Sequence, residues 1–413
     1  MFYILKLTVI DINVTKTIFG SHLMKTFINL KNTPVFDAHC FAYNDDSLTK
    51  DILTSQYAMI GPSPSYMSEP DRDARVSELA LSTGALNKRV HDLAGFLECE
   101  SDISEVIRER ELRRKSNFPE YVKGLIEDIS LKGMGVDTAL YSLEDADNFG
   151  KTFPGFIRKT FRLTTLIKDL LNTSTSFQNL IADYDAAMND AVKNHGCIAF
   201  KSIIAYRTGL DIKEVSESDA AASFDNRKSE PTWHGYKAKA LRDFLIRRSL
   251  LNCIKLDTTF MIHTGLGDSD IVAMECRPLM LWELLTNDEL MECKVMLIHG
   301  GFPYTEEATY MANVLPNVYF DLSAGTGPAF LEKAVSPERF TDVLRSVPNS
   351  KVIYSSDGGE GGPETLWHDC VTAKSAVGYA LGNLVDEGIY DEIKAQSIGE
   401  DIFYNNSKRL FKF

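Results

Sequence analysis

The sequence predicts an α/β fold, a (β/α)₈ barrel of parallel strands. Short apolar or β-branched runs recur along the 413-residue chain, and most of them are followed by a longer helical pattern. Strands that alternate with helices are typical of a parallel sheet with crossover helices, and eight strands close a barrel. The eight runs are Thr33–Phe36, Asp137–Tyr141, Arg158–Thr164, Ile198–Lys201, Thr258–His263, Lys294–His299, Asn317–Leu322 and Lys351–Tyr354.

An open, doubly wound sheet is the structural alternative. Its usual dinucleotide signature, Gly-x-Gly-x-x-Gly, does not follow an early strand in this sequence. The barrel is therefore preferred.

A long helical stretch separates the first two runs. Charged and apolar residues alternate there with the period of a helix, and we expect helices over Val76–Leu97 and Ser104–Leu131. Because a plain βα loop is much shorter, the sequence predicts a helical insertion after the first strand, at about residues 45–132. Residues 1–32 are interpreted as an N-terminal extension, and residues 33–413 as one barrel domain.

Charge and cysteine content limit the kinds of partner. The chain has 44 Lys and Arg against 58 Asp and Glu, a formal charge of −14, so it repels phosphate backbones and anionic lipids. We expect neither nucleic acid nor a membrane as a partner. The apolar N-terminal run is interrupted by Lys6 and Asp11 and is too short to span a bilayer. Seven dispersed cysteines without a Cys-x-x-Cys pair indicate a reducing compartment, the cytoplasm.

Polar residues stand at the ends of the predicted strands, where barrel enzymes carry their chemistry. Histidine and aspartate are suitable ligands for Zn²⁺ or a similar ion, which makes a bound water acidic enough to act as a nucleophile. The residues at strand ends are Asp37, His39, Lys201, His263, His299 and Asp357. His234 and His368 lie elsewhere and are interpreted as surface or loop residues.

Five motifs resemble the amidohydrolase superfamily in its amidohydrolase-2 branch, and in particular the amidohydrolase-like domain of FluG and nodulin/glutamine-synthetase-like proteins. They are VFDAHCF at 35–41, FKSIIAYRTGL at 200–210, MIHTGLGDSDI at 261–271, VMLIHGGFPYTEEATYMANVLPNVYFDLSAG at 295–325 and KVIYSSDGGEGGPE at 351–364. The resemblance implies a TIM barrel of the metal-dependent hydrolase type.

The resemblance also implies roles for the strand-end residues. His39, His263, His299 and Asp357 would be metal ligands, with His299 and Asp357 also catalytic. Lys201 stands where some relatives carry a carbamylated lysine that bridges two metals, or it contacts substrate as a cation.

Phe41 departs from the family pattern. It replaces the second histidine of the family's Asp-x-His-x-His motif. Strand alternation places residues 37, 39 and 41 on one face and Cys40 on the other, so Cys40 is badly placed to substitute. We therefore expect one divalent ion, with zinc as the first choice, in place of a binuclear centre.

Four residues are candidates for substrate recognition or support. Tyr206 and Arg207 could bind a substrate carboxylate, because arginine offers a two-pronged donor; a salt bridge or a packed loop is the alternative. Asp268 and Asp37 are interpreted as supporting residues around the ligands, with a turn aspartate as the alternative for Asp268.

The leading hypothesis is a metal-dependent hydrolase of a small amide, with γ-glutamyl-type amides as one candidate class. A metal-dependent decarboxylase of the same branch is the second hypothesis. The third is a non-catalytic binding or developmental protein with a degenerate metal site. The expected partners are a small-molecule substrate and further copies of the chain.

Overall fold

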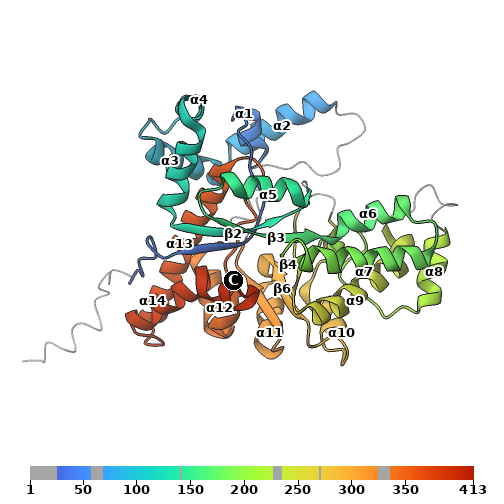
Figure 1. Cartoon of the computed structure of the whole chain (residues 1–413). Helices are drawn as coiled ribbons and strands as arrows, with labels where there is room; N and C mark the ends of the chain where they lie inside the picture. The colour runs from blue at the N-terminus through green and yellow to red at the C-terminus, as the bar shows by residue number, and fades with distance from the viewer. Residues whose placement is uncertain (1–25, 57–67, 140–141, 227–234, 269–270, 324–334) are drawn as a thin grey trace, which may run out of the picture.

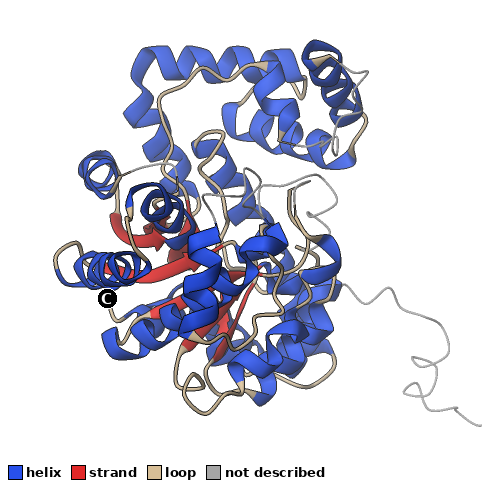
Figure 2. Ribbon diagram, turned by 90° about the vertical axis from the view of Figure 1, so that its right-hand side faces the viewer, coloured by secondary structure: helices blue, strands red, loops and turns tan. Residues whose placement is uncertain are grey.

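The computed structural model describes residues 26–56, 68–139, 142–226, 235–268, 271–323 and 335–413. Within these ranges the chain forms one eight-stranded parallel sheet with its strands in sequence order and helices around it (Figures 1 and 2). The predicted (β/α)₈ barrel is thereby confirmed. The strands are β1 (Val35–Cys40), β2 (Leu131–Asp137), β3 (Phe156–Arg162), β4 (Cys197–Ser202), β5 (Thr259–His263), β6 (Lys294–Ile298), β7 (Val318–Asp321) and β8 (Val352–Ile353).

The barrel is nearly closed between its last and first strands. β8 is short and pairs with β7. The chain that follows it runs along β1: the Ala38 N–H donates to the Tyr354 carbonyl (3.2 Å), and the Asp357 N–H donates to the His39 carbonyl (2.9 Å). These bonds bring the residues after β8 directly beside the end of β1.

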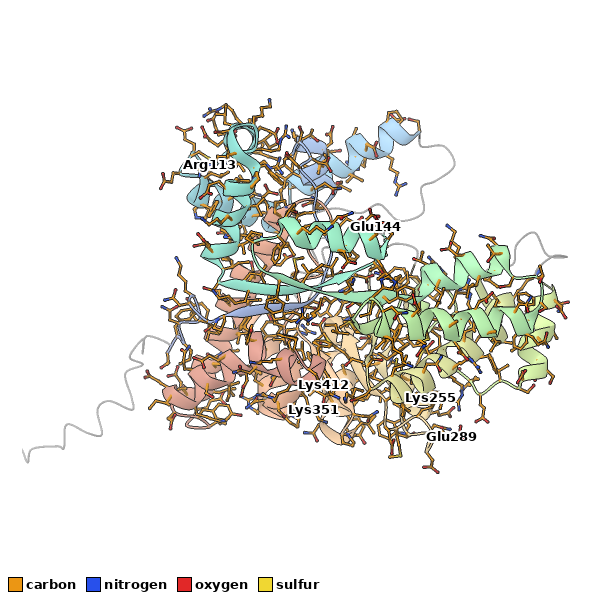
Figure 3. The ribbon with its side chains drawn as sticks, in the orientation of Figure 1. Arg113, Glu144, Lys255, Glu289, Lys351 and Lys412 are labelled. Carbon is orange, nitrogen blue, oxygen red and sulfur yellow. The ribbon has the colours of Figure 1, made fainter. Side chains whose placement is uncertain are left out.

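Helices form the outer layer, and their exposed side carries charged side chains such as Glu144 and Lys255 (Figure 3). The helices are α1 (Lys50–Ser55), α2 (Glu69–Leu81), α3 (Gly84–Leu97), α4 (Ile103–Asp128), α5 (Leu143–Thr152), α6 (Leu163–Thr173), α7 (Phe177–Lys193), α8 (Glu217–Asn226), α9 (Lys239–Leu256), α10 (Trp282–Leu285), α11 (Thr305–Val314), α12 (Pro337–Ser346), α13 (Pro363–Asp386), α14 (Glu392–Glu400) and α15 (Asn406–Phe411). Short helical turns include η2 (Ile204–Tyr206) and η6 (His299–Gly301). None of the helices in the described ranges is long and apolar enough to cross a membrane.

The second strand lies earlier than predicted. It covers Leu131–Asp137, whereas the sequence analysis placed it over 137–141. Two glycines in this segment weaken the usual strand pattern. The structure explains one of them: a Cβ at Gly135 would lie 2.5 Å from the carbonyl oxygen of Ala38, so β1 and β2 can approach each other only with glycine here.

The long helix expected over Val76–Leu97 is two helices. α2 ends at Leu81 and α3 begins at Gly84. Between them the Thr83 side chain accepts a hydrogen bond from the Leu86 N–H (3.3 Å). This is an N-cap, which favours a new helix start over a continuous helix.

The helix expected over Ser104–Leu131 is α4, and it is shorter and kinked. It ends at Asp128, because Leu131 already belongs to β2. Asn117 has a non-helical backbone two residues before Pro119, and proline disfavours helical geometry in the segment before it. Helices α1 to α4 gather in the upper part of Figure 1, above β2 and β3.

Aromatic side chains from the C-terminus fill the floor of the barrel. The ring of Phe413 lies 4.2 Å from that of Phe36 in β1 and 5.3 Å from that of Phe156 at the start of β3. The same inner cluster contains Ala38, Ala199, Met261, Met296, Ile298 and Ile353. Because this end is packed, the chemistry is left to the other end, where the strands have their C-termini.

A buried ion pair connects the helices between β1 and β2 to the barrel. Arg110 of α4, 2% exposed, donates through Nε to Oε1 of Glu364 in the first turn of α13 (2.7 Å). The Tyr121 hydroxyl donates to the same oxygen (2.9 Å). Since Glu364 follows the glycine-rich loop after β8, this pair links the insertion to the loop beside the barrel mouth.

We expect Glu364→Gln to lower the free energy of unfolding by about 1–3 kcal/mol, because it removes the carboxylate that faces Arg110 Nε and the Tyr121 hydroxyl, while Arg110 keeps its second partner Glu111. Urea unfolding measures the change. Glu387→Gln is the control, since it removes a surface pair with Arg345 and should cost no more than about 1 kcal/mol. Equal effects of the two substitutions would contradict a stabilising role of the buried pair.

Candidate functional site

His39 reaches the mouth of the barrel because β1 breaks its alternation. Phe36 and Ala38 pack in the inner cluster, whereas Cys40 belongs to the outer one, and the pairing with β2 shifts between Asp37 and Cys40. The strict alternation predicted for this strand is therefore wrong. The conclusion about Cys40 stands, because its Sγ faces the Gly135 carbonyl oxygen at 3.7 Å.

The His39 ring lies between two carboxylates. Its Nε2 is 2.9 Å from Oδ2 of Asp137, and its Nδ1 is 3.0 Å from Oδ1 of Asp357. Burial and the nearby charge of Lys201 disfavour the protonated ring, but the hydrogen bonds to the two carboxylates outweigh them and raise the pKa of His39 above its usual value. The predicted ligands His39 and Asp357 are thus in direct contact.

His263 and His299 form a second pair. Nδ1 of His263, at the end of β5, lies 3.1 Å from Nε2 of His299, which follows β6. Burial lowers the pKa of His263 well below its usual value, and the His299 charge adds to this effect. Burial also lowers the pKa of His299 to about 3, against the opposing charge of Asp357. Both rings are therefore neutral near pH 7, as metal binding requires.

Hydrogen bonds from the next strand hold His299 in place. Its φ is +68°, a left-handed conformation that is uncommon outside glycine. Its N–H donates to Oδ2 of Asp321 in β7 (2.9 Å), and its Nδ1 lies 2.9 Å from the Ser323 hydroxyl. Ser323 in turn donates to Asp321, as does Ser355 (2.7 Å). These hydrogen bonds stabilise a backbone conformation of His299 that is unfavourable by itself, as is common at functional sites.

Asp357 is the ligand candidate that solvent can reach. Its side chain is 18% exposed, against 1% for His39, and its φ is +60°. Its Oδ2 lies 3.9 Å from His299 Nε2. Burial opposes ionisation, but the hydrogen bond with His39 and the charges of His39 and Lys201 hold the pKa of Asp357 well below its usual value.

Lys201 is buried on β4 among charged groups from four strands. Burial lowers its pKa to about 8, opposed by the charge of Asp357 and assisted by that of Arg162; Asp137 and Asp321 also favour the ammonium form. The lysine therefore faces the group formed by His39, Asp137 and Asp357, and its predicted role as a substrate or metal-bridging residue stays a prediction.

The sequence analysis missed Asp137 and Arg162 as site residues. Arg162 ends β3 and donates to both oxygens of Asp137, through Nε (3.0 Å) and Nη2 (2.5 Å). The Arg162 charge and the His39 hydrogen bond overcome burial and hold the pKa of Asp137 below its usual value. The misplaced second strand hid Asp137 as a strand-end residue. Strand boundaries four to six residues earlier would have placed it in the same series as His39.

Tyr206 and Asp268 lie close to His263. The Tyr206 ring, in η2 after β4, contacts the His263 ring edge-on with centroids 4.7 Å apart. Its hydroxyl accepts a hydrogen bond from the Asp268 N–H (3.1 Å). Arg207 donates through Nη1 to the Tyr206 carbonyl (2.9 Å). The structure thus brings Tyr206 to the mouth, while a role for Arg207 in binding a carboxylate stays a prediction.

Asp37 holds the segment after β8 in place through hydrogen bonds. Its oxygens accept hydrogen bonds from the N–H (2.9 Å) and hydroxyl (2.5 Å) of Ser356, the residue before Asp357. Burial raises its pKa to about 7. Phe41 is buried beside His39, with ring centroids 5.7 Å apart, and it fills the place of the second histidine with an apolar ring.

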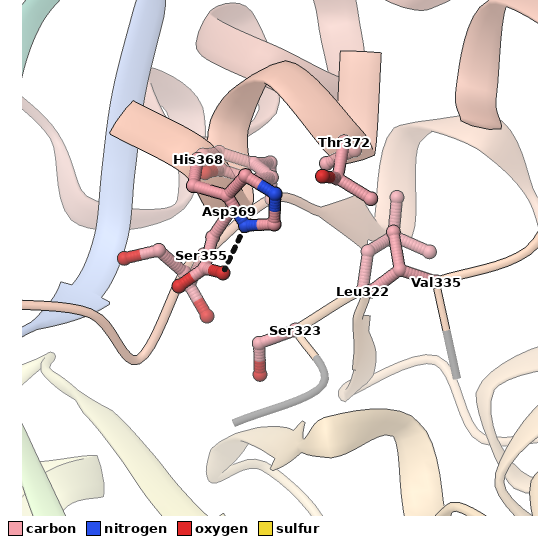
Figure 4. Close-up of a pocket in the computed structure, with 10 residues that line it drawn as sticks. Leu322, Ser323, Val335, Ser355, His368, Asp369 and Thr372 are labelled. Carbon is pink, nitrogen blue, oxygen red and sulfur yellow. Dashed lines mark ion pairs between the residues drawn. The ribbon is translucent and has the colours of Figure 1, made fainter. Parts of the chain in front are cut away.

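A pocket lies between the ends of β7 and β8 and the first turns of α13 (Figure 4). Its lining consists of Leu322, Ser323, Val335, Tyr354, Ser355, Ser356, His368, Asp369, Thr372 and Ala373. His368 is 2% exposed, with Nε2 3.3 Å from Oδ2 of Asp92 in α3, so the interpretation of His368 as a surface or loop residue is wrong. The cause is α13, which begins directly after the site loop and turns this histidine inward. His234 lies outside the described residues.

The distances between the donor atoms can be compared with those around one divalent ion. A tetrahedral site with bonds of about 2.0–2.1 Å separates neighbouring ligand atoms by about 3.3 Å. The facing donor pairs lie 3.0 Å (His39 and Asp357), 3.1 Å (His263 and His299) and 3.9 Å (His299 and Asp357) apart. Across the described ranges no three His, Cys, Asp or Glu side chains already form a complete ion-binding group. The donor types suit one divalent ion, and each of these three pairs lies within about 0.6 Å of that spacing.

Comparison with known proteins places this site in a family context. The Amidohydro_2 profile, described as amidohydrolase, matches residues 224–413. The protein FluG of Emericella nidulans is 31% identical over 254 residues, which are 59% of this chain and 29% of FluG. The chain therefore spans less than a third of the length of this relative.

Solved structures share the fold. A Lactobacillus casei protein described as a candidate metal-dependent hydrolase superposes with a TM-score of 0.76 at 21% identity, covering 94% of this chain and 98% of that chain. A uronate isomerase from Bacillus halodurans has a TM-score of 0.64 at 14% identity, with 93% and 94% covered. At these identities the likeness shows the TIM-barrel fold alone.

Proposed function

We propose, from the premise that this chain belongs to the amidohydrolase-2 superfamily and resembles FluG, that it is a zinc-dependent hydrolase of a small amide. The observation that carries the proposal is the meeting of four donor residues from four different strand ends. His39, His263, His299 and Asp357 approach one another pairwise at 3.0–3.9 Å. A cytoplasmic location, expected from the dispersed cysteines, is part of the proposal.

His39, His263, His299 and Asp357 would hold the ion. Bound zinc would lower the pKa of a water molecule and polarise the amide carbonyl. His263 and His299 are neutral and so offer their lone pairs without first losing a proton. The Phe41 ring leaves the second imidazole of the motif unreplaced, which supports one ion per chain.

Asp357 is proposed to move the proton. It is ionised, it is partly open to solvent, and it lies against His39. Its carboxylate can accept a proton from water as the new C–O bond forms and can return that proton to the leaving nitrogen as the C–N bond breaks. Lys201 and Tyr206, from β4 and the turn after it, are proposed to orient the substrate.

The substrate class is proposed as γ-glutamyl-type amides. Its support is the resemblance to the domain that accompanies glutamine synthetase in FluG-like proteins. The test incubates the zinc-loaded protein with γ-glutamyl anilides and amides and measures release of the amine, with α-glutamyl and acetyl amides as comparison substrates. Amine release from the γ-glutamyl compounds alone is the expected result, whereas release from none of the amides would contradict the hydrolase.

We expect protein purified without added metal, then dialysed with zinc, to retain about one zinc ion per chain, because the four donors close one tetrahedral site. Elemental analysis measures the ratio. Two tightly held ions would contradict the mononuclear site. No retained metal would favour a binding protein with a degenerate site.

A further inference from the structure

The environment of His39 contains a carboxylate that cannot itself be a metal ligand. Oδ1 of Asp137 accepts hydrogen bonds from Arg162 Nε (3.0 Å) and the Ala139 N–H (3.0 Å). Oδ2 is shared by Arg162 Nη2 (2.5 Å) and His39 Nε2 (2.9 Å). Both oxygens are saturated, so Asp137 does not take the place of the histidine that Phe41 replaces.

This arrangement sets which nitrogen of His39 carries a proton. Asp137 is completely buried, and each of its oxygens already accepts a hydrogen bond from Arg162, so the carboxylate is an acceptor toward His39 as well. The 2.9 Å contact therefore requires a proton on Nε2 of His39. In the neutral ring the lone pair is then on Nδ1, which lies 3.0 Å from Oδ1 of Asp357.

The contact on the other side of the His39 ring requires a positive charge beside Nδ1. Nδ1 of His39 and Oδ1 of Asp357 are 3.0 Å apart. In the neutral ring both atoms are acceptors, and two acceptors at this distance need a proton or a cation between them. A divalent ion beside Nδ1 and Oδ1 would supply that positive charge, and a second ring proton is the alternative that the NMR measurement below distinguishes.

We infer that Asp137 and Arg162 are positioning residues that fix His39 as the Nε2-protonated tautomer, so that Nδ1 is the nitrogen presented to the divalent ion. The inference rests on the proposed function, because the ion is part of it. Carboxylate partners of metal-binding histidines fix the tautomer and raise the basicity of the ligand in this way.

Three neighbouring strands make this arrangement rigid. His39, Asp137 and Arg162 come from β1, β2 and β3, which pair in that order. Arg162 is 8% exposed, and its N–H donates to the Thr138 hydroxyl (3.2 Å). The arginine therefore fixes the carboxylate from the adjacent strand, and the orientation of His39 follows from strand pairing.

The first test reads the tautomer directly. Protein labelled with ¹⁵N-histidine is examined by NMR without metal up to pH 9.5 and then with zinc, and the His39 signals are assigned by their loss in His39→Gln. We expect a protonated Nε2 in the metal-free ring and the zinc-induced shift on Nδ1. A zinc shift on Nε2, an Nδ1-protonated ring, or a ring doubly protonated to pH 9.5 would overturn the inference.

The second test measures zinc affinity in competition with a chromophoric chelator. Asp137→Asn should weaken zinc binding by about 10–100-fold, as is usual for loss of such a partner. Asp185→Asn is the matched control, because Asp185 is also held by an arginine, Arg248, on the outer helices α7 and α9; its zinc affinity should stay within threefold of wild type. An unchanged zinc affinity in folded Asp137→Asn would overturn the inference.

The two tests separate this inference from the proposed function. Should Asp137→Asn fail to fold, the NMR measurement on the wild-type chain still decides the tautomer. Should the wild type bind no zinc, the hydrolase proposal fails, while a protonated Nε2 in the metal-free spectrum still supports the positioning by Asp137. An Nδ1-protonated ring together with one bound zinc would leave the hydrolase standing and refute the positioning.

Discussion

Asp357→Asn should lower kcat by about 10²–10⁴-fold, the usual contribution of a general acid–base group. Asparagine keeps the size of the side chain and tolerates the left-handed backbone of this position, φ +60°, so we expect the fold to persist. Its amide cannot accept and return a proton. The measurement compares kcat and the melting temperature of the zinc-loaded variant with wild type.

The control for this change is Asp342→Asn. Asp342 is 78% exposed on α12 and pairs with Arg345, so kcat should stay at the wild-type value. A folded, zinc-loaded Asp357→Asn enzyme with kcat within threefold of wild type would remove Asp357 from the proton transfer. A large loss of zinc would instead assign Asp357 mainly to metal binding.

His299→Asn is expected to weaken zinc binding by more than the 10–100-fold that an outer partner contributes. The substitution removes Nε2 beside His263 and Nδ1 beside Ser323. Asparagine is again chosen for its tolerance of positive φ, here +68°, so that backbone strain does not enter the result. Competition with a chelator measures the affinity without any substrate.

His195→Asn is the control, because His195 is a half-exposed imidazole on the surface beside Asp190. It should leave zinc affinity unchanged. Full zinc occupancy of His299→Asn with lost turnover would make His299 a catalytic residue outside the ligand set. The four-donor site would then be reduced to His39, His263 and Asp357.

The site residues that could be predicted from the sequence are those at the C-terminal ends of strands. His39, His263, His299 and Asp357 follow apolar runs, and parallel strands in a barrel bring their C-terminal ends together whatever the loops do. Residues in regular, strongly apolar strands such as β5 and β6 were therefore placed correctly. β2 was misplaced because its two glycines weaken the strand pattern, although one of them, Gly135, permits the close approach of Ala38.

The sequence by itself determined the barrel and the types of donor at its mouth, because apolar periodicity and residue chemistry are local properties. Only the tertiary structure decided which atoms face one another. The break in alternation at His39, the saturation of Asp137 by Arg162 and the burial of His368 all depend on neighbouring strands and helices far apart in the chain. The physical reason is that hydrogen-bond partners and desolvation are set by what packs against a residue, and strand spacing alone does not encode them.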